Sequence, residues 1–231
     1  MLGVTDLTLH YKQSQILHGV SLSADVGKVT CVMGRNGVGK TSLLKAIAGV
    51  HHRSGGEITL DGQVLARPGA DELAHMGVAY VPQGREIFPL LTVRENLETG
   101  FTCLPRHARR VPDEIFELFP VLKEMQRRRG GDLSGGQQQQ LAIGRALIMQ
   151  PKLLLLDEPT EGIQPNIIQQ IGRVIRYLRD QGKMAIVLVE QYFDFAHELA
   201  DEFVAMERGA VTLSGDKASV SRDELLRRVS V

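Results

Sequence analysis

The feature that most constrains this chain is a glycine-rich segment, residues 34–41, with the sequence GRNGVGKT. It fits the pattern Gly-x-x-x-x-Gly-Lys-Ser/Thr, which forms a loop around nucleotide phosphates when it follows a strand and opens a helix. Both neighbours are present, because Val29–Met33 is an unbroken apolar run and Thr41–Ala48 favours a helix. The segment therefore predicts an α/β fold with a phosphate site at the carboxyl edge of its sheet.

Each residue type in this P-loop has a use around a triphosphate. Glycines let backbone N–H groups curl around the phosphates, and the helix N-terminus adds partial positive charge. The alternative is an ordinary glycine-rich turn, but the whole pattern arises by chance in about one chain in a hundred of this length. We therefore predict that ATP and Mg²⁺ bind here, that Lys40 reaches the β and γ phosphates, and that the Thr41 hydroxyl ligates magnesium. The predicted nucleotide contacts in the loop are Gly34, Arg35, Asn36, Gly37, Val38, Gly39, Lys40, Thr41 and Ser42.

Other apolar runs predict a mainly parallel core sheet. Val78–Val81, Leu153–Leu156 and Ala185–Val189 lack alternating polar residues, which is typical of strands buried on both faces. Helices should cover that sheet, and the clearest is Pro165–Gln181, which carries one apolar stripe at helical spacing. The fold class predicted is that of a P-loop NTPase.

Two further regions complete the predicted architecture. The pattern between residues 84 and 150 is mostly helical, and Asp223–Val229 favours a short terminal helix. No internal repeat or long linker separates these parts, so we expect one domain, 1–231, with a helical subdomain at about 84–150. Short strands of a second, antiparallel layer are predicted near the N-terminus, with a turn at Asp61-Gly62, over Val4–Tyr11, Gly19–Ala24 and Glu57–Leu60.

Composition narrows the possible partners and the compartment. The 27 Lys and Arg residues equal the 27 Asp and Glu residues, which argues against a nucleic-acid partner because such proteins usually carry a basic excess. The longest apolar runs are far shorter than the roughly 20 residues that span a bilayer, so any membrane role requires partner proteins. Two cysteines without Cys-x-x-Cys spacing and no apolar leader favour the reducing cytosol.

Two carboxylates, Asp157 and Glu158, end the apolar run Leu153–Leu156. The carboxyl edge of a parallel sheet is where ligands of open α/β folds bind. We predict that Asp157 holds magnesium, directly or through water, and that Glu158 is the general base that polarises the attacking water. A plain acidic pair at a strand end is the alternative, and the P-loop in the same chain favours the catalytic interpretation.

A second phosphate-binding helix end is predicted at Ser134–Gln137. Ser134 and Gln137 have the spacing of a capping box, in which each side chain bonds the backbone N–H of the other residue. A cap does not explain the adjacent Gly135 and Gly136, because glycine weakens a first helical turn. Glycines there leave the helix N–H groups open to a phosphate.

Taken together, these motifs resemble the ABC ATPase family, whose signature is Leu-Ser-Gly-Gly-Gln, here residues 133–137. The resemblance covers essentially the whole chain. It implies a head-to-tail dimer in which ATP lies between the P-loop of one subunit and the signature of the other. The residues that would serve the partner's nucleotide are Ser134, Gly135, Gly136 and Gln137.

The resemblance also implies roles for residues that no spacing rule identifies. Tyr11 matches the aromatic residue that stacks on adenine, although a tyrosine at a strand end is the plain alternative. Gln83 matches the glutamine that contacts magnesium and senses the permease. The catalytic set that the resemblance implies consists of Lys40, Gln83, Glu158 and Gln191.

Two positions depart from the common family pattern. Gln164 stands where many members have the aspartate of the D-loop, and Gln191 stands where a switch histidine usually follows the strand. A glutamine can donate a hydrogen bond to a γ-phosphate but carries no proton to transfer and no charge. We expect hydrolysis to be retained, because Glu158 is present, with Gln191 positioning the γ-phosphate.

Within the family, Pro159–Pro165 and Val189–Gln191 resemble the subunits that energise branched-chain amino acid and urea uptake. Pro82–Pro89, Ile115–Leu122 and Met184–Tyr192 are similar to the ATPase subunit of urea transporters. The resemblance thus implies an importer of urea, with branched-chain amino acids or related amides as the alternative solutes. A non-transport ABC ATPase is the rival from another class, but it would usually carry long coiled-coil insertions, and heptads are absent here.

The same resemblance implies a set of partners. These are a second, different ABC ATPase subunit, with a homodimer as the alternative in isolation, two transmembrane permeases, and a periplasmic or extracellular solute-binding protein. It implies a location on the cytoplasmic face of the inner membrane, held there by the permeases. The expected permease contacts lie beside Gln83, at Arg85, Ile87 and Phe88, although the two apolar side chains could instead pack under the helical lobe.

Overall fold

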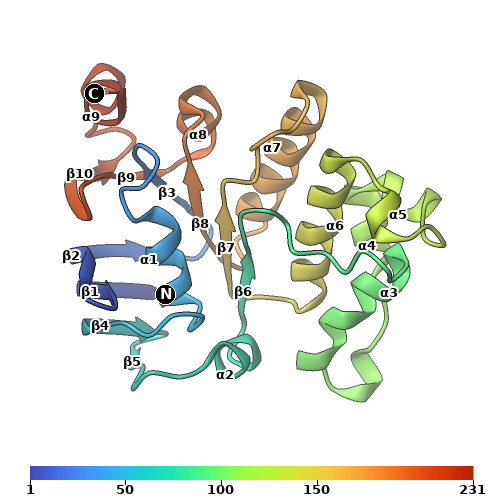
Figure 1. Cartoon of the computed structure of the whole chain (residues 1–231). Coiled ribbons are helices and arrows are strands. Elements are labelled where there is room, and N and C mark those ends of the chain that lie inside the picture. The colour runs from blue at the N-terminus through green and yellow to red at the C-terminus, as the bar shows by residue number, and fades with distance from the viewer. Residues whose placement is uncertain (231) are drawn as a thin grey trace.

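The computed structural model describes residues 1–230 and contains two sheets and a helical lobe (Figure 1). The strands are β1 (Leu2–Tyr11), β2 (Ser14–Ala24), β3 (Val29–Met33), β4 (Gly55–Leu60), β5 (Gln63–Val64), β6 (Val78–Val81), β7 (Leu153–Asp157), β8 (Ala185–Glu190), β9 (Glu202–Glu207) and β10 (Ala210–Asp216). The α-helices are α1 (Lys40–Ile47), α2 (Ala70–His75), α3 (Val93–Glu98), α4 (Asp113–Leu118), α5 (Pro120–Glu124), α6 (Gly135–Ile148), α7 (Pro165–Asp180), α8 (Phe193–Leu199) and α9 (Arg222–Ser230). Short 3₁₀ turns lie at Thr99–Cys103, Arg106–Ala108 and Gly130–Asp132.

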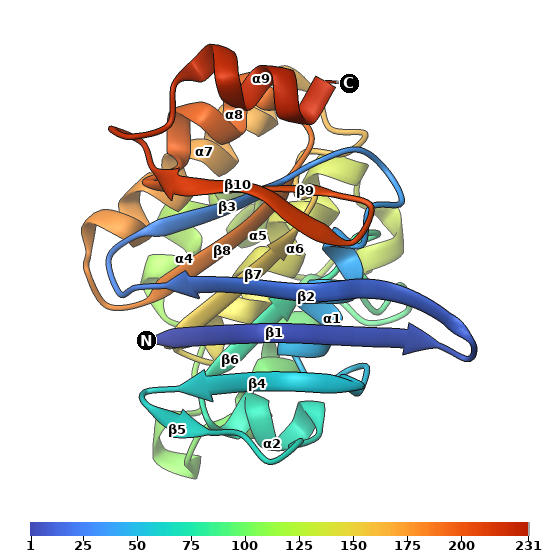
Figure 2. The ribbon, with the colours of Figure 1, turned by 90° about the vertical axis from the view of Figure 1, so that its left-hand side faces the viewer.

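The larger sheet has the strand order β10-β9-β3-β8-β7-β6 and is parallel except for β10. Both of its faces are buried, as the unbroken apolar runs predict. Leu154 and Leu156 of β7 belong to the core that the larger sheet forms with α6, α7 and α8, whereas Leu153 and Leu155 belong to the core formed with α1 and the smaller sheet. Helix α1, and with it the P-loop, is therefore held between the two sheets (Figures 1 and 2).

The smaller sheet confirms the predicted antiparallel layer, with the order β2-β1-β4-β5. Asp61 and Gly62 form the tight turn between β4 and β5, and both have positive φ angles of 51° and 78°. Strand β2 begins at Ser14, earlier than expected. Gly19, with φ of 79°, is an extra residue between the β1–β2 pairs Leu7–Val20 and Thr8–His18, and this bulge hides the first half of the strand from a pattern reading.

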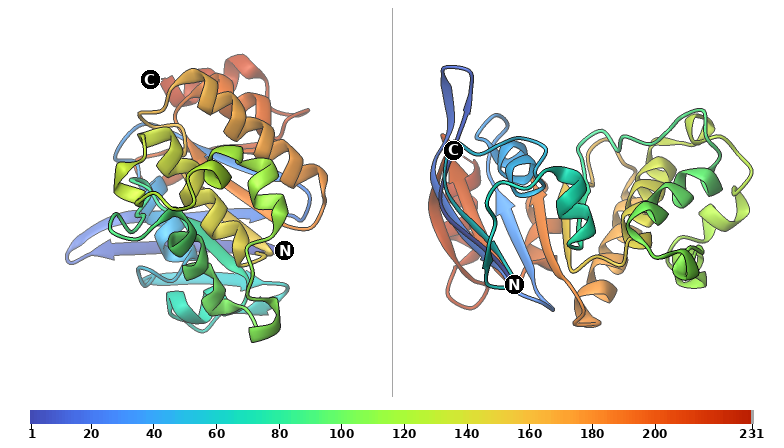
Figure 3. Two further views of the ribbon diagram at one scale, coloured as in Figure 1. Left: turned by 90° about the vertical axis from the view of Figure 1, so that its right-hand side faces the viewer. Right: turned by 90° about the horizontal axis from the view of Figure 1, so that it is seen from below.

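The helical lobe lies at one end of the larger sheet and contains α3 to α6 (Figure 3). Its interior is apolar, since Phe119 and Leu122 are fully buried against the same core as α6. The predicted capping box at the start of α6 is confirmed, because Ser134 N donates to Gln137 Oε1 at 2.9 Å and Gln137 N donates to Ser134 Oγ at 3.4 Å. The limits of the lobe, about 84–150, stay a prediction.

Strands β9 and β10 were not anticipated from the sequence. Strand β9 pairs in parallel with β3, and β10 closes that edge of the sheet as an antiparallel strand. The terminal helix expected over Asp223–Val229 is α9. Within residues 1–230, every helix is too short or too polar to reach across a bilayer.

Candidate functional site

The P-loop joins β3 to α1 in a conformation that requires its glycines. Gly34, Gly37 and Gly39 have φ angles of 153°, 80° and 104°. A Cβ at Gly34 would lie 2.4 Å from the carbonyl oxygen of Met206, and one at Gly39 would lie 2.8 Å from a Leu17 methyl group. A side chain is therefore unfavourable for the backbone conformation at all three positions, and at two of them it also lacks space.

The loop fits a triphosphate on two observations. A Cβ at Gly37 would meet nothing within 4 Å, so the backbone there faces open space. The N-cap of α1, Gly39, supplies no side-chain hydrogen bond to the first N–H groups of the helix. Backbone donors at a helix N-terminus with no side-chain cap form an anion-binding site.

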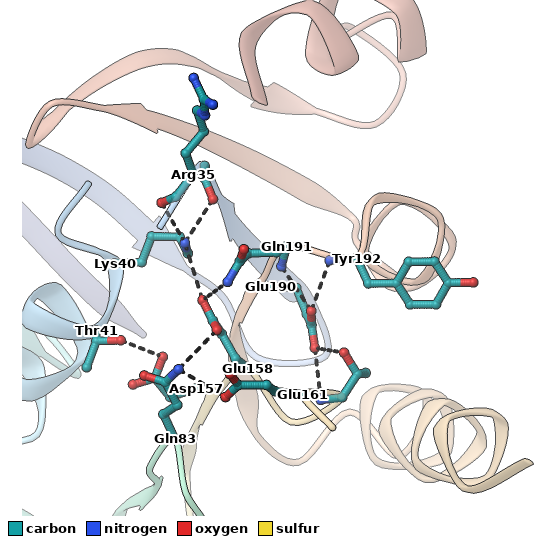
Figure 4. A network of polar contacts seen from close by, with 12 residues as sticks. Arg35, Lys40, Thr41, Gln83, Asp157, Glu158, Glu161, Glu190, Gln191 and Tyr192 are labelled. Carbon is teal, nitrogen blue, oxygen red and sulfur yellow. Dashed lines mark hydrogen bonds and ion pairs between the residues drawn. The ribbon is translucent and has the colours of Figure 1, made fainter. Parts of the chain in front are cut away.

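Lys40 is the first residue of α1 and is 4% exposed. Its ammonium donates to the carbonyl oxygens of Gly34, at 2.8 Å, and Arg35, at 3.0 Å. It also lies 3.3 Å from Glu158 Oε1, which links the P-loop to the carboxyl end of β7 (Figure 4). The Arg35 side chain extends away from this network in the same view, so Arg35 joins it through its backbone.

Asp157 and Thr41 supply oxygens suited to a magnesium ion. The Thr41 hydroxyl donates to Asp157 Oδ1 at 3.1 Å, and the Tyr80 hydroxyl donates to Asp157 Oδ2 at 3.0 Å. Burial raises the pKa of Asp157, and the hydrogen bonds from Tyr80 and Thr41 oppose that shift. Burial, together with the Asp157 carboxylate, also raises the pKa of Tyr80, which keeps its hydroxyl a donor. Carboxylate and hydroxyl oxygens are the ligands that magnesium prefers, so these residues fit the metal.

Glu158 is the centre of the network. Its Oε1 accepts a hydrogen bond from Gln191 Nε2 at 2.7 Å, and its Oε2 accepts one from Gln83 Nε2 at 3.3 Å. Its φ angle of 47° is left-handed, which is unfavourable for a residue with a side chain and is typical of functional sites. The structure thus brings the four expected catalytic residues, Lys40, Gln83, Glu158 and Gln191, around one carboxylate (Figure 4).

A second buried carboxylate, Glu190, was missed by the sequence reasoning. Glu190 is only 2% exposed, and its carboxylate accepts four hydrogen bonds. Thr160 N and Thr160 Oγ1 donate to Oε1 at 3.1 and 2.7 Å, and the N–H groups of Gln191 and Tyr192 donate to Oε2 at 2.9 and 3.2 Å. Burial raises the pKa of Glu190, and these bonds oppose the shift. Glu190 therefore joins the loop after Asp157-Glu158 to the loop that carries Gln191.

The sequence contained a signal for Glu190, because it ends a buried parallel strand as Asp157 does. Glu161 was also missed. It accepts a hydrogen bond from Gln83 Nε2 at 3.0 Å and so shares that amide with Glu158. Tyr80 is the one polar side chain of β6, and a polar side chain within a buried strand is the signal that it bonds a polar group nearby, here Asp157.

The remaining predicted site residues lie outside this network. Tyr11 is at the end of β1, 39% exposed, with its ring in edge contact with His51 at 4.3 Å between centroids. The signature, Ser134–Gln137, opens α6, which the strands of the larger sheet separate from α1 (Figure 1). Gln164 is the N-cap of α7 and makes no side-chain cap bond. The roles assigned to these residues, and to Asn36, Val38 and Ser42 of the P-loop, stay predictions.

Comparison with known proteins places these features in context. Residues 17–161 match the family model described as ABC transporter. The chain is 39% identical over 228 residues to the high-affinity branched-chain amino acid transport ATP-binding protein BraG of Pseudomonas aeruginosa, covering 98% of this chain and 97% of that protein. It is 35% identical over 216 residues to a probable branched-chain amino acid transport ATP-binding protein LivF of Archaeoglobus fulgidus, covering 93% of this chain and 92% of that protein.

Two solved structures illustrate the likeness of the fold. One, described as the ATP binding subunit of an ABC transporter, superposes with a TM-score of 0.86 at 26% identity and covers 100% of both chains. Another is an ATP-binding cassette in a dimeric, post-hydrolysis state bound to ADP and phosphate, with a TM-score of 0.84 at 25% identity, covering 94% of this chain and 99% of that one.

Proposed function

This chain belongs to the ABC transporter family and is an ATPase, and on that premise we propose that it powers solute uptake as one nucleotide-binding subunit of an importer. One observation carries the proposal: the buried carboxylate of Glu158 accepts a hydrogen bond from Gln191 and forms an ion pair with Lys40 of the P-loop. A base, a phosphate-binding cation and a donor amide are the groups that phosphoryl transfer to water requires.

In the proposed reaction, ATP is the substrate and the P-loop holds its phosphates. Lys40 and the N-terminus of α1 bind the phosphate oxygens, and Gln191 donates to the γ-phosphate. Glu158 accepts a proton from water as the water oxygen bonds to the γ-phosphorus and the bond to the β-phosphate oxygen breaks. A magnesium ion held by Thr41 and Asp157, with Gln83 nearby, would neutralise negative charge on the phosphates.

The signature is assigned to the nucleotide of a second subunit. The position of the signature supports this assignment, since α6, which begins with the signature, lies on the opposite face of the larger sheet from α1. Support also comes from the related cassette that was solved as a dimer. We propose a head-to-tail dimer in which Ser134–Gln137 completes the site on the partner, with a different ABC ATPase as that partner in the cell.

For the solute, we propose branched-chain amino acids first. The relatives BraG and LivF are named for branched-chain amino acid transport, which favours what the sequence resemblance left as the alternative. Urea is the second candidate, on the likeness of Pro82–Pro89, Ile115–Leu122 and Met184–Tyr192 to urea transporter subunits. The subunit itself contacts ATP and not the solute, so its chemistry does not discriminate between the two.

Permeases are the proposed membrane anchors, and Phe88 and Leu90 are the proposed contacts. These side chains are 49% and 78% exposed. Asn96 fixes their loop, because its Oδ1 accepts from Phe88 N at 2.8 Å and its Nδ2 donates to the carbonyl oxygens of Phe88 and Leu91 at 2.9 and 3.1 Å. Ile87, expected beside Phe88, instead packs against the core. Docking there would hold the chain at the cytoplasmic face of the membrane, next to a solute-binding protein on the other side.

The function is tested by measuring ATP turnover and uptake. The chain should hydrolyse ATP with magnesium, and Glu158→Gln should abolish turnover while the protein remains folded. In its native cell, the chain should co-purify with permeases, and Lys40→Ala should stop the uptake of radiolabelled leucine. Loss of urea uptake with leucine uptake intact would select urea, and co-purification with DNA or ribosomes without permeases would refute the transporter assignment.

A further inference from the structure

The segment that follows Gln83 has an unusual backbone. Gly84, Arg85 and Glu86 have successive φ angles of 84°, 73° and 45°. Left-handed backbone is open to glycine but unfavourable for arginine and glutamate. Two such residues in succession persist only where the surrounding structure holds them, and such strain gathers at functional sites.

Helix α6, whose N-terminus carries the signature, holds this segment. Arg145 of α6 donates from Nη1 to the carbonyl oxygen of Glu86 at 3.0 Å and from Nη2 to that of Arg85 at 3.4 Å. Its guanidinium also lies 5.5 Å from the centroid of the Phe88 ring. Arg145 therefore holds the strained segment against the signature helix through two hydrogen bonds and one contact with an aromatic ring.

The Arg85 side chain reaches back to the beginning of the same helix. A Cβ at Gly135, the first residue of α6, would lie 3.1 Å from Arg85 Nη1, 3.2 Å from Nη2 and 3.3 Å from Cζ. Gly135 thus leaves the space that the guanidinium occupies, which accounts for one of the two adjacent glycines that the cap does not explain. Gly136 has a different neighbour, because its Cβ would lie 3.1 Å from Ile167 of α7.

Arg85 also touches the loop that follows the catalytic carboxylates. Its Nη2 donates to the carbonyl oxygen of Glu161 at 3.3 Å. The Glu161 carboxylate accepts from Gln83 Nε2 at 3.0 Å, and the same amide donates to Glu158. One guanidinium therefore connects the signature helix, the Gln83 loop and the loop after Glu158.

This arrangement does not favour folding on its own. A cation beside the N-terminus of a helix faces the positive end of the helix dipole, which is unfavourable. The same residue also has a left-handed backbone. Because Arg85 has two features that destabilise the fold, we expect it to serve function and not stability.

We propose that Arg85 is a positioning residue that sets the signature helix against the Gln83 loop and the Glu161 loop. The proposal rests on the proposed function, in which the signature completes the ATP site of the partner subunit. Because its guanidinium contacts the signature helix and the Glu161 loop, Arg85 governs turnover, and ATP binding by the P-loop of its own chain is left unchanged.

The test compares Arg85→Met, Arg85→Lys and the matched control Arg94→Met in the full chain assembled with its partner ATPase. Arg94 is a surface arginine that pairs with Glu98 at 2.8 Å on α3. Arg85→Met should lower kcat about ten-fold or more, with KM for ATP within about two-fold and a melting temperature no lower than that of the parent protein. Arg85→Lys should recover part of kcat, and Arg94→Met should match the parent in every measurement.

Three results would overturn the proposal: a parental kcat in Arg85→Met, a raised KM with unchanged kcat, or a melting temperature several degrees lower with no recovery of kcat in Arg85→Lys. The parent and Glu158→Gln are measured alongside. A parent without ATPase activity refutes the proposed function, whereas an active parent, an inactive Glu158→Gln and an unaffected Arg85→Met refute only the role of Arg85.

Discussion

The pairing of Lys40 with Glu158 predicts that Glu158→Gln binds ATP more tightly than the parent. The Lys40 ammonium lies 3.3 Å from Glu158 Oε1, and the two side chains are 3% and 6% exposed. Phosphate oxygens compete with this carboxylate for the same ammonium. The glutamine variant removes the competitor and also removes a negative charge close to the triphosphate.

The structure sets the size of the effect. Two unit charges at 3.3 Å attract by about 5 kcal/mol at an effective dielectric constant of about 20. Most of this is offset by desolvation, and Lys40 also keeps its hydrogen bonds to Gly34 and Arg35. A remainder of about 1.5–3 kcal/mol corresponds to an ATP Kd that is roughly 10 to 100 times lower.

Isothermal titration calorimetry with ATP, without magnesium and at concentrations where the chain is monomeric, measures this affinity apart from hydrolysis and dimer formation. Glu161→Gln is the matched control, because Glu161 accepts from the same Gln83 amide whereas the ion pair of Lys40 is with Glu158. Its ATP Kd should equal that of the parent. An ATP Kd in Glu158→Gln within about two-fold of the parent, or an equal tightening in Glu161→Gln, would refute the reasoning.

Three further predictions follow from the same network. Gln191→Ala should lower kcat by about 10 to 100 times in steady-state ATPase assays, because it removes the 2.7 Å donor to Glu158, and a parental rate would contradict the assigned role. Glu190→Ala should lower the free energy of unfolding in urea by about 3 kcal/mol, since it leaves two buried donors of Thr160 and two partly buried backbone N–H groups without their acceptor, and a loss below about 1 kcal/mol would show that water replaces the carboxylate. The pKa of Asp157 is higher in the folded protein than in the unfolded chain, where it is about 3.9. Asp157 therefore stabilises the fold fully at a pH below the unfolded-state pKa, and this stabilisation is lost as the pH rises through the folded-state pKa. Asp157→Asn should therefore flatten that fall in magnesium-free urea unfolding above about pH 4, and an unchanged slope would assign the fall to other groups.

The sequence predicted the elements whose signals are local. The P-loop, the four buried strands and α7 were readable because glycine spacing, unbroken apolar runs and helical periodicity each depend on a few neighbouring residues. The capping box of α6 was readable for the same reason. By contrast, the first half of β2 lies before the bulge at Gly19, and no residue of β10 is fully buried, so neither has an uninterrupted apolar pattern.

The site was predictable where one motif contains the chemistry and was not predictable where the contacts join distant segments. Asp157 and Glu158 followed from their place at a strand end. The role of Glu190 depends on Thr160, which lies 30 residues away, and the place of Arg85 depends on Gly135. The sequence offers no spacing rule for such pairs, because they are set by how β6, β7, β8 and α6 pack.

The left-handed backbone of Glu158 has a consequence for laboratory evolution of this chain. Glycine or asparagine adopts a φ of 47° more readily than glutamate, so either replacement relieves local strain, but both delete the carboxylate. Each replacement also leaves the buried Lys40 without its carboxylate partner, so the relief of backbone strain and the loss of the ion pair oppose one another, and every such variant lacks the catalytic base. Heat resistance and turnover therefore have to be screened together, and libraries aimed at a thermostable enzyme should hold this codon fixed.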